Sequence, residues 1–281
     1  MYNNRLTFVV AVNDSSVLQS NFLASPILSC GTRHQVLLQK GFPSAGRAYN
    51  GALDFAKNEI VVFVHQDVFF PARWDAKLFA QIAAIEAFDA DWGVIGCIGV
   101  SSQGEIVGHA YCNSSQGEVG NPSCADAVEV RSLDEFVLAF RKSSGLVFDE
   151  NLPYFHFYGT DVCLSAQSKG LRNYAISNFC VHNAMPVIEL SREFWLCAKY
   201  MTAKWYEKLP VRTTCTTLTS SFRLRLFLRL RSRWGSFKRV MRGDASITRI
   251  SAPHRVVPGG HSLLPNGDPV VPPREGGMTY E

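Results

Sequence analysis

An α/β fold, with a mostly parallel mixed sheet flanked by helices, is the architecture that the sequence predicts. Two apolar runs, residues 6–12 and 60–64, leave no room for a polar face and are typical of strands buried on both sides. Segments with helical spacing alternate with these strands, as in nucleotide-binding α/β sheets. Polar residues stand where both strands end, at the edge where such sheets bind ligands.

The composition is that of a globular protein with a locally basic end. The 281 residues are 47% apolar and 19% charged, which is enough to bury a full core. The net charge of +4 depends on a stretch between Arg212 and Arg242 that contains nine Arg and Lys residues and no acid. We therefore expect one domain over 1–210, a basic amphipathic helical segment over 211–243 and a flexible Pro/Gly-rich tail over 244–281.

The cysteines and the start of the chain indicate a reducing compartment. Eight cysteines occur without a CxxC pair, as expected of reduced thiols in a core. The start, MYNNRLTFVV, lacks the features of a signal peptide, and no apolar run reaches the length of a membrane span. We expect a cytoplasmic protein.

Two strand-helix units precede the strand at 60–69. The strand at 6–12 ends on Asn13, Asp14, Ser15 and Ser16, which supply N-caps for a helix to about Leu23. A short strand at 36–38 and a helix over 44–57 follow. Neither GxGxxG nor GxxxxGK[ST] is present, so neither a dinucleotide nor a P-loop triphosphate is indicated. A sheet that binds phosphates without these motifs usually recruits a metal, and Asp67 is the candidate ligand.

The second half of the expected domain carries a further polar cluster. A helix over 74–88 and a strand over 92–100 are followed by a Gly/Ser/Asn-rich loop or hairpin at 101–126, then by strands at 128–130 and 136–140. Thr160 is expected to cap the next helix and to place Asp161 in its first turn, where an ionised carboxylate is favoured and can act as a base. The alternative is that Asp161 only stabilises the helix start. His182 follows a last strand at 174–176, and a lone loop histidine is more often a surface residue than a ligand.

These motifs together resemble a known family. A buried strand ending in HQD, an SAGRAYNGALDFAK helix before it, an SLDEFVLAFRKSSGLVFDE stretch, FHFYGTD and a later His are similar to inverting nucleotide-sugar glycosyltransferases of family 2. The branch with an HQD metal motif, that of the streptomycin-biosynthesis-type glycosyltransferase-like proteins, is the most similar. The resemblance covers roughly residues 6–182. It implies a GT-A fold, Mn²⁺ or Mg²⁺ on the donor diphosphate, and one-step displacement with inversion at the anomeric carbon.

The resemblance also implies roles for individual residues. Asp67 would hold the metal, with His65 and His182 as further ligands, and Asp161 would be the catalytic base. The donor, a nucleotide-diphosphate sugar, would be bound by Asn13, Asp14, Arg47, Asn50, Gln66 and Asp67. A carbohydrate or lipid-linked acceptor would be bound by Asp134, Tyr154, His156 and Tyr158.

The sequence departs from the family pattern at several of these positions. His65 and Gln66 stand where acidic residues are common, and Thr160 replaces the Glu of the catalytic pair. Tyr49 stands where an Arg is usual, which leaves Arg47 as the nearby cation for phosphate. The strand at 36–38 ends in Gln39 and Lys40 in place of an aspartate pair that would hold a uracil, so the nucleobase stays open.

The C-terminal part predicts a surface partner. A long amphipathic helix is expected over 187–206. Residues 220–242 interleave Arg with Leu, Phe and Trp, which is typical of a helix in an anionic membrane interface, here on the inner face. A protein partner is an alternative. Nucleic acid is a weaker one, because most of the apolar residues are aliphatic and do not stack on bases.

Two other functions compete with glycosyl transfer. A non-catalytic nucleotide- or sugar-binding module on the same fold would explain the reduced acidic motif. A nucleotidyltransferase would need a basic residue beside the phosphates near the first strand, and residues 13–16 offer none.

Overall fold

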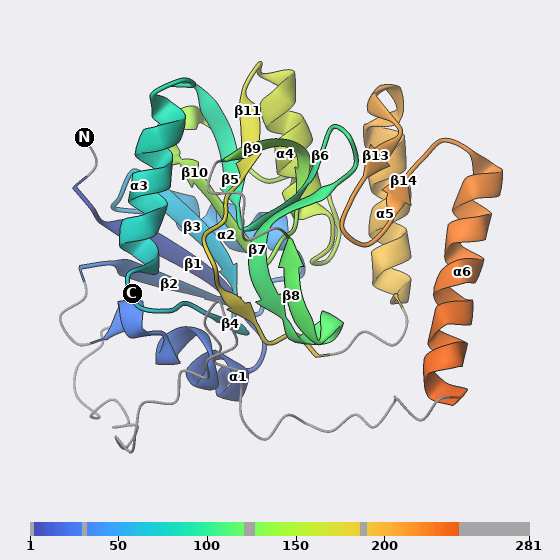
Figure 1. Ribbon diagram of the computed structural model, residues 1–281, viewed down its shortest axis with the longest axis horizontal. Coiled ribbons are helices and arrows are strands. Elements are labelled where there is room, and N and C mark those ends of the chain that lie inside the picture. The colour runs from blue at the N-terminus through green and yellow to red at the C-terminus, as the bar shows by residue number, and fades with distance from the viewer. Residues whose placement is uncertain (1–2, 30–32, 121–126, 186–189, 242–281) are drawn as a thin grey trace.

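A computed structural model of the chain describes residues 3–29, 33–120, 127–185 and 190–241, with side chains as far as residue 231. One large sheet runs through the centre of the molecule, and helices lie on both of its faces (Figure 1). The tail that we expect over 244–281 lies outside the described residues.

The strand order of the large sheet is β2-β1-β3-β10-β5-β11-β9-β6-β7-β12-β4. The α/β class predicted from the sequence is confirmed. The sheet is more strongly mixed than we expected, because hairpins and return strands contribute most of its second half. The strands are β1 (Leu6–Val12), β2 (Gln35–Lys40), β3 (Ile60–His65), β4 (Val68–Phe69), β5 (Trp92–Gly96), β6 (Ile98–Ser101), β7 (Ile106–Cys112), β8 (Gly117–Gly120), β9 (Val128–Leu133), β10 (Val137–Arg141), β11 (Arg172–Ala175) and β12 (Val181–His182).

The parallel part of the sheet brings three strand ends together. β1 pairs in parallel with both β2 and β3, and the register places Ala11 beside His65 and Val12 beside Lys40. β10 runs antiparallel to β3 and sets Val137 opposite Val64, so the turn before β10 lies at the same edge as the end of β3. Polar residues that follow β1, β2 and β3 therefore meet at one edge of the sheet.

Six helices accompany the sheet among the described residues. They are α1 (Ser15–Ser20), α2 (Ala45–Leu53), α3 (Trp74–Glu86), α4 (Tyr158–Ser168), α5 (Arg192–Lys204) and α6 (Phe222–Met241). The helices expected over 44–57 and 74–88 are confirmed as α2 and α3, each shorter than predicted at its C-terminal end. None of the helices in the described part of the chain has both the length and the apolar character needed to cross a membrane.

Aromatic side chains pack on both faces of the parallel strands. The Phe63 ring lies 5.1 Å from Tyr49 of α2 and 4.7 Å from Phe140 of β10, measured between ring centroids. Phe8 pairs with Val62 and so points to the opposite face, where its ring lies 6.3 Å from Trp74 of α3. Burial of such rings is the main source of stability at this centre, at roughly 1.5–3 kcal/mol per large apolar side chain.

The start of α4 differs from the sequence-based expectation. The N-cap is Phe157, in the left-handed region with φ 66°, while Thr160 lies inside the helix. The Asp161 N–H donates to the Phe157 carbonyl oxygen at 2.8 Å, so helical hydrogen bonding begins earlier than a Thr160 cap would allow. Asp161 is nevertheless in the first turn, as predicted.

The segments around the expected loop and the C-terminal boundary are more regular than predicted. Residues 98–120 form the strands β6, β7 and β8, which is the hairpin alternative, and residues 121–126 lie outside the described residues. Residues 211–218, which we grouped with the basic helical segment, form a hairpin of β13 (Val211–Arg212) and β14 (Thr217–Leu218). Val211 and Leu218 are buried in the main core, so this hairpin is part of the folded body.

Both C-terminal helices occur where the sequence predicts them. α5 begins after Ser191, whose hydroxyl accepts the Phe194 N–H at 3.2 Å. The expected start of this helix at 187 lies outside the described residues. α6 stands beside α5 at the edge of the molecule (Figure 1), and the Arg229 guanidinium lies 5.8 Å from the Trp195 ring.

Two glycines of α2 provide a matched test of this packing. A Cβ at Gly46 would overlap the main chain of Asp149, with the carbonyl carbon only 2.8 Å away, whereas a Cβ at Gly51 would meet Phe42 at an ordinary 3.8 Å. We expect Gly46→Ala to lower the free energy of unfolding by about 1–3 kcal/mol, because neither backbone can yield. Gly51→Ala should raise it by up to about 1 kcal/mol, since alanine is the better helix former. Urea unfolding of both variants tests this, and equal effects would contradict the close approach.

Candidate functional site

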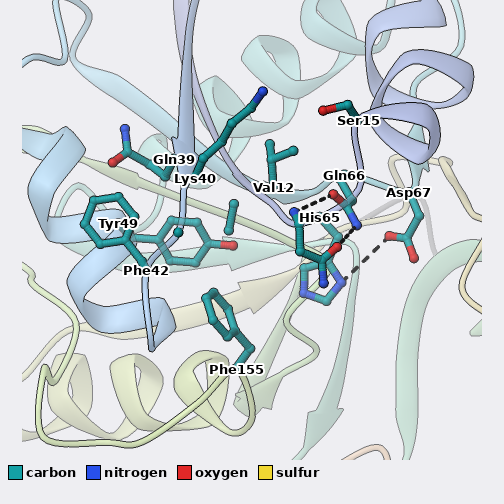
Figure 2. A pocket seen from close by; sticks show the side chains of 13 residues that line it. Val12, Ser15, Gln39, Lys40, Phe42, Tyr49, His65, Gln66, Asp67 and Phe155 are labelled. Carbon is teal, nitrogen blue, oxygen red and sulfur yellow. Dashed lines mark hydrogen bonds and ion pairs between the residues drawn. The ribbon is translucent and has the colours of Figure 1, made fainter.

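A pocket of about 570 Å³ opens at the carboxyl ends of β1, β2 and β3. Figure 2 shows Gln39, Lys40, Phe42 and Tyr49 on one side of it, and His65, Gln66 and Asp67 on the other. The remaining lining residues are Ala11, Val12, Asn13, Ser15, Gly41 and Phe155. Its volume is in the range of small-molecule and cofactor sites, which is about 300–1,000 Å³.

Gln66 fixes the loop that follows β1. Its Oε1 accepts the N–H groups of Asn13 and Asp14, both at 3.0 Å, and its Nε2 donates to the Asn13 side chain. The Asp14 carboxylate in turn caps α1 through the N–H groups of Ser16 and Val17. Gln66 and Asn13 line the pocket, whereas the Asp14 carboxylate is used within its own helix start.

Strand pairing brings the three predicted metal ligands together. β12 pairs with β4, so that His182 lies opposite Val68, next to Asp67. Asp67 Oδ1 is 3.4 Å from His182 Nε2 and 4.0 Å from His65 Nδ1. One ligand atom from each of the three residues lies within 4.8 Å of the others, and the His182 ring stacks on Phe136 at 4.6 Å.

The environment sets the protonation of the two histidines differently. Burial lowers the pKa of His65 to about 4, so this imidazole is neutral at pH 7. Burial also disfavours a charge on His182, but the neighbouring Asp67 carboxylate outweighs it and raises the pKa of His182 to about 10. Burial raises the pKa of Asp67, yet the positive charge of His182 dominates and holds it at about 2.

A hydrogen-bond chain fixes the orientation of His65. The Tyr158 hydroxyl donates to the Glu135 carbonyl oxygen at 3.0 Å, so it accepts from His65 Nε2 at 2.7 Å. The Nε2 atom therefore carries the proton, and the lone pair of Nδ1 points toward Asp67. This arrangement, in which one ring nitrogen is held by a second residue, is usual for histidine ligands of metals.

The donor atoms fit a divalent cation. Asp67 Oδ1 and His182 Nε2 are both buried, and they face each other as an ion pair at 3.4 Å that lacks hydrogen-bond geometry. Buried polar atoms are almost always hydrogen-bonded, so a facing pair without hydrogen bonds is typical of a site for an ion. Two imidazoles and one carboxylate suit Mn²⁺ or another transition metal better than Mg²⁺, which prefers oxygen ligands. A cation bound here would replace the proton on His182.

Asp14, Arg47 and Asn50, three of the predicted donor-binding residues, lie outside the pocket lining. Arg47 is exposed on α2. Asn50 holds α2 against the segment before α4: its Nδ2 donates to the Phe148 carbonyl oxygen at 2.9 Å, and its Oδ1 accepts the Phe148 N–H at 2.9 Å. The role that we predict for these three residues in donor binding stays a prediction.

Asp161, the predicted base, is held away from the pocket. Its side chain is 1% exposed, and its Oδ1 accepts from both Lys204 Nζ and Trp205 Nε1 at 2.7 Å. Burial raises the pKa of Asp161, although Lys204 opposes this shift. The contacts join α4 to the end of α5, and the catalytic role of Asp161 stays a prediction.

The predicted acceptor residues differ in what they contact. Tyr158 is buried beside His65, and the His156 ring packs against Phe194 at 5.4 Å. Tyr154 is 40% exposed, and the role in acceptor binding that we predict for these residues stays a prediction. Asp134 Oδ2 accepts from the Thr214 hydroxyl at 2.6 Å, which ties it to the β13–β14 hairpin.

Sequence reasoning missed part of the pocket. Ser15, Phe42 and Phe155 line it without having been predicted, while Gln39, Lys40 and Tyr49 were noted only as departures from a family pattern. The signal for Gln39 and Lys40 was available, since they end a strand parallel to β1. Phe155 carries no such signal, because it comes from a segment far along the chain.

Comparisons with known proteins identify related chains. A family described as glycosyltransferase-like matches residues 7–194. A protein of Fuscovulum blasticum, described as ATP synthase subunits region ORF 6, is 33% identical over 136 residues, which are 45% of this chain and 52% of that protein. The chain therefore spans about half the length of this curated relative.

Solved structures of low sequence identity are also similar. A mannosyltransferase from Pyrobaculum calidifontis in complex with GDP-Man and Mn²⁺ is 14% identical, with 86% of this chain and 75% of that chain covered and a TM-score of 0.46. S. aureus TarS 1–349 in complex with UDP is 13% identical, with 71% and 65% covered and a TM-score of 0.45.

The metal site makes a direct prediction for ion binding. We expect Asp67→Asn to weaken Mn²⁺ binding at least about tenfold, because an amide oxygen is a poorer ligand for a hard cation than a carboxylate. Asp54→Asn, which removes an exposed carboxylate of the same charge at the end of α2, should leave Mn²⁺ affinity unchanged. Calorimetric titration with Mn²⁺ alone compares the three proteins. Equal affinity in Asp67→Asn and the unsubstituted chain would remove Asp67 from the site.

Proposed function

Because the chain belongs to the glycosyltransferase-like family, we propose that it transfers a sugar from a nucleotide-diphosphate donor to an acceptor hydroxyl, with inversion and with help from Mn²⁺. The observation that carries the proposal is the buried ion pair of Asp67 Oδ1 and His182 Nε2, which lacks hydrogen-bond geometry, beside the pocket at the end of β3. A donor diphosphate is the ligand that needs both such a pocket and such a cation.

The lining of the pocket suits a nucleotide. Phe42, 38% exposed, offers a ring face for stacking on a base, and Gln39 offers an amide for hydrogen bonds to it. Lys40 adds a positive charge on the same side. With the base at this end, the diphosphate would extend toward Gln66 and Asp67, and the sugar would approach Phe155.

The residues at the end of β3 would hold the cation that stabilises the leaving group. When bound, a divalent cation supplies positive charge that stabilises the departing diphosphate. Asp67, His65 and His182 would hold it, and Tyr158 keeps His65 in the required tautomer. The backbone amides of residues 13 and 14 are already used by Gln66, so that loop supplies a rigid wall and few donors for phosphate.

A second candidate is a non-catalytic binding module on the same fold. It is favoured by one observation: the carboxylate predicted as the base, Asp161, is bound to Lys204 and Trp205. Such a module would bind a nucleotide sugar without turnover. Release of nucleoside diphosphate from the donor distinguishes the two candidates.

A thermal-shift screen tests the proposed donor class. We expect at least one of UDP-glucose, UDP-N-acetylglucosamine and GDP-mannose to raise the melting temperature in the presence of Mn²⁺, since a ligand at 100 times its Kd stabilises the native state by about 2.7 kcal/mol. Asp67→Asn should lose the Mn²⁺-dependent part of the shift. No shift with any of these nucleotides would count against the proposal.

We also propose that α6 binds an anionic membrane surface, where a lipid-linked acceptor would be available. Phe222, Leu224, Leu226, Phe227 and Leu230 are between 39% and 70% exposed on this helix. Arginines alternate with them, and the sequence of α6 contains no acid. Exposed apolar side chains among cations match the headgroup and acyl boundary of an anionic bilayer.

Vesicle binding tests this surface. We expect the double substitution Phe227→Ser and Leu230→Ser to reduce cosedimentation with vesicles of phosphatidylserine and phosphatidylcholine by at least about tenfold, because each side chain contributes roughly 1.5–3 kcal/mol on burial. Phe55→Ser, which removes an aromatic ring that is 69% exposed elsewhere, is the matched control. Equal binding of both variants, or equal binding to vesicles without phosphatidylserine, would refute the membrane surface.

A further inference from the structure

Glu135 lies at the same sheet edge as the metal ligands. It belongs to the turn between β9 and β10, and the residue after it, Phe136, accepts the His65 N–H through its carbonyl oxygen at 3.0 Å. Its own carbonyl oxygen accepts the Tyr158 hydroxyl, which also contacts His65. Two hydrogen bonds therefore connect the main chain of this turn to the end of β3.

The side chain of Glu135 occupies a place that the start of α4 leaves open. Gly159 has no side chain, and a Cβ there would stand 3.0 Å from Glu135 Cγ and 2.9 Å from the Leu133 carbonyl oxygen. The Phe157 N–H, at the N-cap of α4, lies close enough to the Glu135 carboxylate to lower its pKa. The Glu135 side chain therefore extends from the turn between β9 and β10 to the start of α4.

The other carboxylates of this region are already engaged. Asp161 is bound to Lys204 and Trp205, and Asp134 accepts from the Thr214 hydroxyl and from the Glu135 N–H. Asp67 faces His182. Glu135 is half-buried, and it forms no salt bridge with any of the described residues.

Glu135 lies next to a segment, residues 154–157, that borders both expected substrate sites. Phe157, which contacts its carboxylate, is two residues from Phe155, which lines the donor pocket. Tyr154 and Phe155 are 40% and 36% exposed, so this segment has aromatic faces available for an acceptor sugar. An acceptor on these rings would lie between the donor pocket and the start of α4.

We propose, on the basis of the function proposed above, that Glu135 is the general base that accepts the proton of the acceptor hydroxyl. As the acceptor oxygen forms its bond to the anomeric carbon, its proton passes to the Glu135 carboxylate. The bond between the anomeric carbon and the diphosphate oxygen breaks, and its electron pair leaves with the nucleoside diphosphate. The product has the inverted configuration, and the proton on Glu135 returns to solvent.

The environment of Glu135 agrees with this role. Burial raises the pKa of Glu135 well above its ordinary value, the negative charge of Asp134 adds to the shift, and the Phe157 N–H opposes it. A carboxylate with a raised pKa is a stronger proton acceptor than an exposed one, and enzymes commonly tune glutamates in this direction.

A comparison of two nucleophiles tests the role. Donor cleavage by water needs a base, whereas azide is already an anion and attacks without losing a proton. With UDP-glucose, UDP-N-acetylglucosamine and GDP-mannose as probes and Mn²⁺ present, we expect Glu135→Gln to slow release of nucleoside diphosphate in water by about 10²–10⁴-fold. Formation of the glycosyl azide should change less than about threefold, and the donor-induced thermal shift should be retained.

Controls separate this role from a structural one. Asp149→Asn removes a half-buried carboxylate that pairs with Lys204 outside the site, and it should lower the melting temperature without changing the ratio of water to azide reaction. Glu135→Asp keeps the charge and shortens the side chain, so its reaction with water should be faster than that of Glu135→Gln. If Glu135→Gln folds poorly, Glu135→Asp replaces it in the test.

Each outcome decides a different question. Equal loss of the water and azide reactions in Glu135→Gln, or no loss of either, overturns the role of Glu135 while leaving the transferase. Selective loss of the water reaction in Asp161→Asn assigns the role of the base to Asp161 and also overturns the role of Glu135. A chain that binds donors but releases no nucleoside diphosphate, even with azide, is the binding module and refutes both the proposed function and this role.

Discussion

The pairing of β3 with β1 on one side and β10 on the other is the constraint on which the rest of the site depends. The parallel register with β1 aligns the ends of both strands, and the antiparallel register with β10 brings the turn at residues 134–136 to the same edge. Ile60, Val61, Val62, Phe63 and Val64 are all fully buried, so a register slip would move large side chains to the wrong face. The apolar strand therefore holds His65 and Asp67 in place.

A small set of buried hydrogen bonds then orders the side chains at this edge. Tyr158 joins His65 of β3 to the Glu135 carbonyl oxygen, and Gln66 joins the same strand end to the loop after β1. Removing one partner of such a bond leaves the other buried and unsatisfied, at a cost of about 1–3 kcal/mol. Against this background of satisfied groups, the buried ion pair of Asp67 and His182, which lacks hydrogen-bond geometry, stands out as a candidate place for a cation.

The carboxylates around the site differ in chemistry because their neighbours differ. Asp161 is nearly fully buried and is bound by a lysine and an indole, so it joins α4 to α5. Glu135 is half-buried, lies close to the Phe157 N–H and has no cationic partner in the described part of the chain. A base must be both accessible and free to accept a proton, and these requirements favour the residue that the sequence does not single out.

The sequence by itself determined the α/β class, the strands at 6–12 and 60–65, the presence of helices over 44–57 and 74–88, which the structure shortens, and the choice of Asp67 as the candidate metal ligand. These features are local, because apolar runs and helical spacing are read from neighbouring residues. The tertiary structure decided what depends on distant segments: that His182 meets Asp67 through the pairing of β12 with β4, that Phe155 lines the pocket, and that Asp161 is bound by Lys204. The spacing of residues along the sequence does not predict these contacts, since each joins residues that only the packing of the whole sheet brings together.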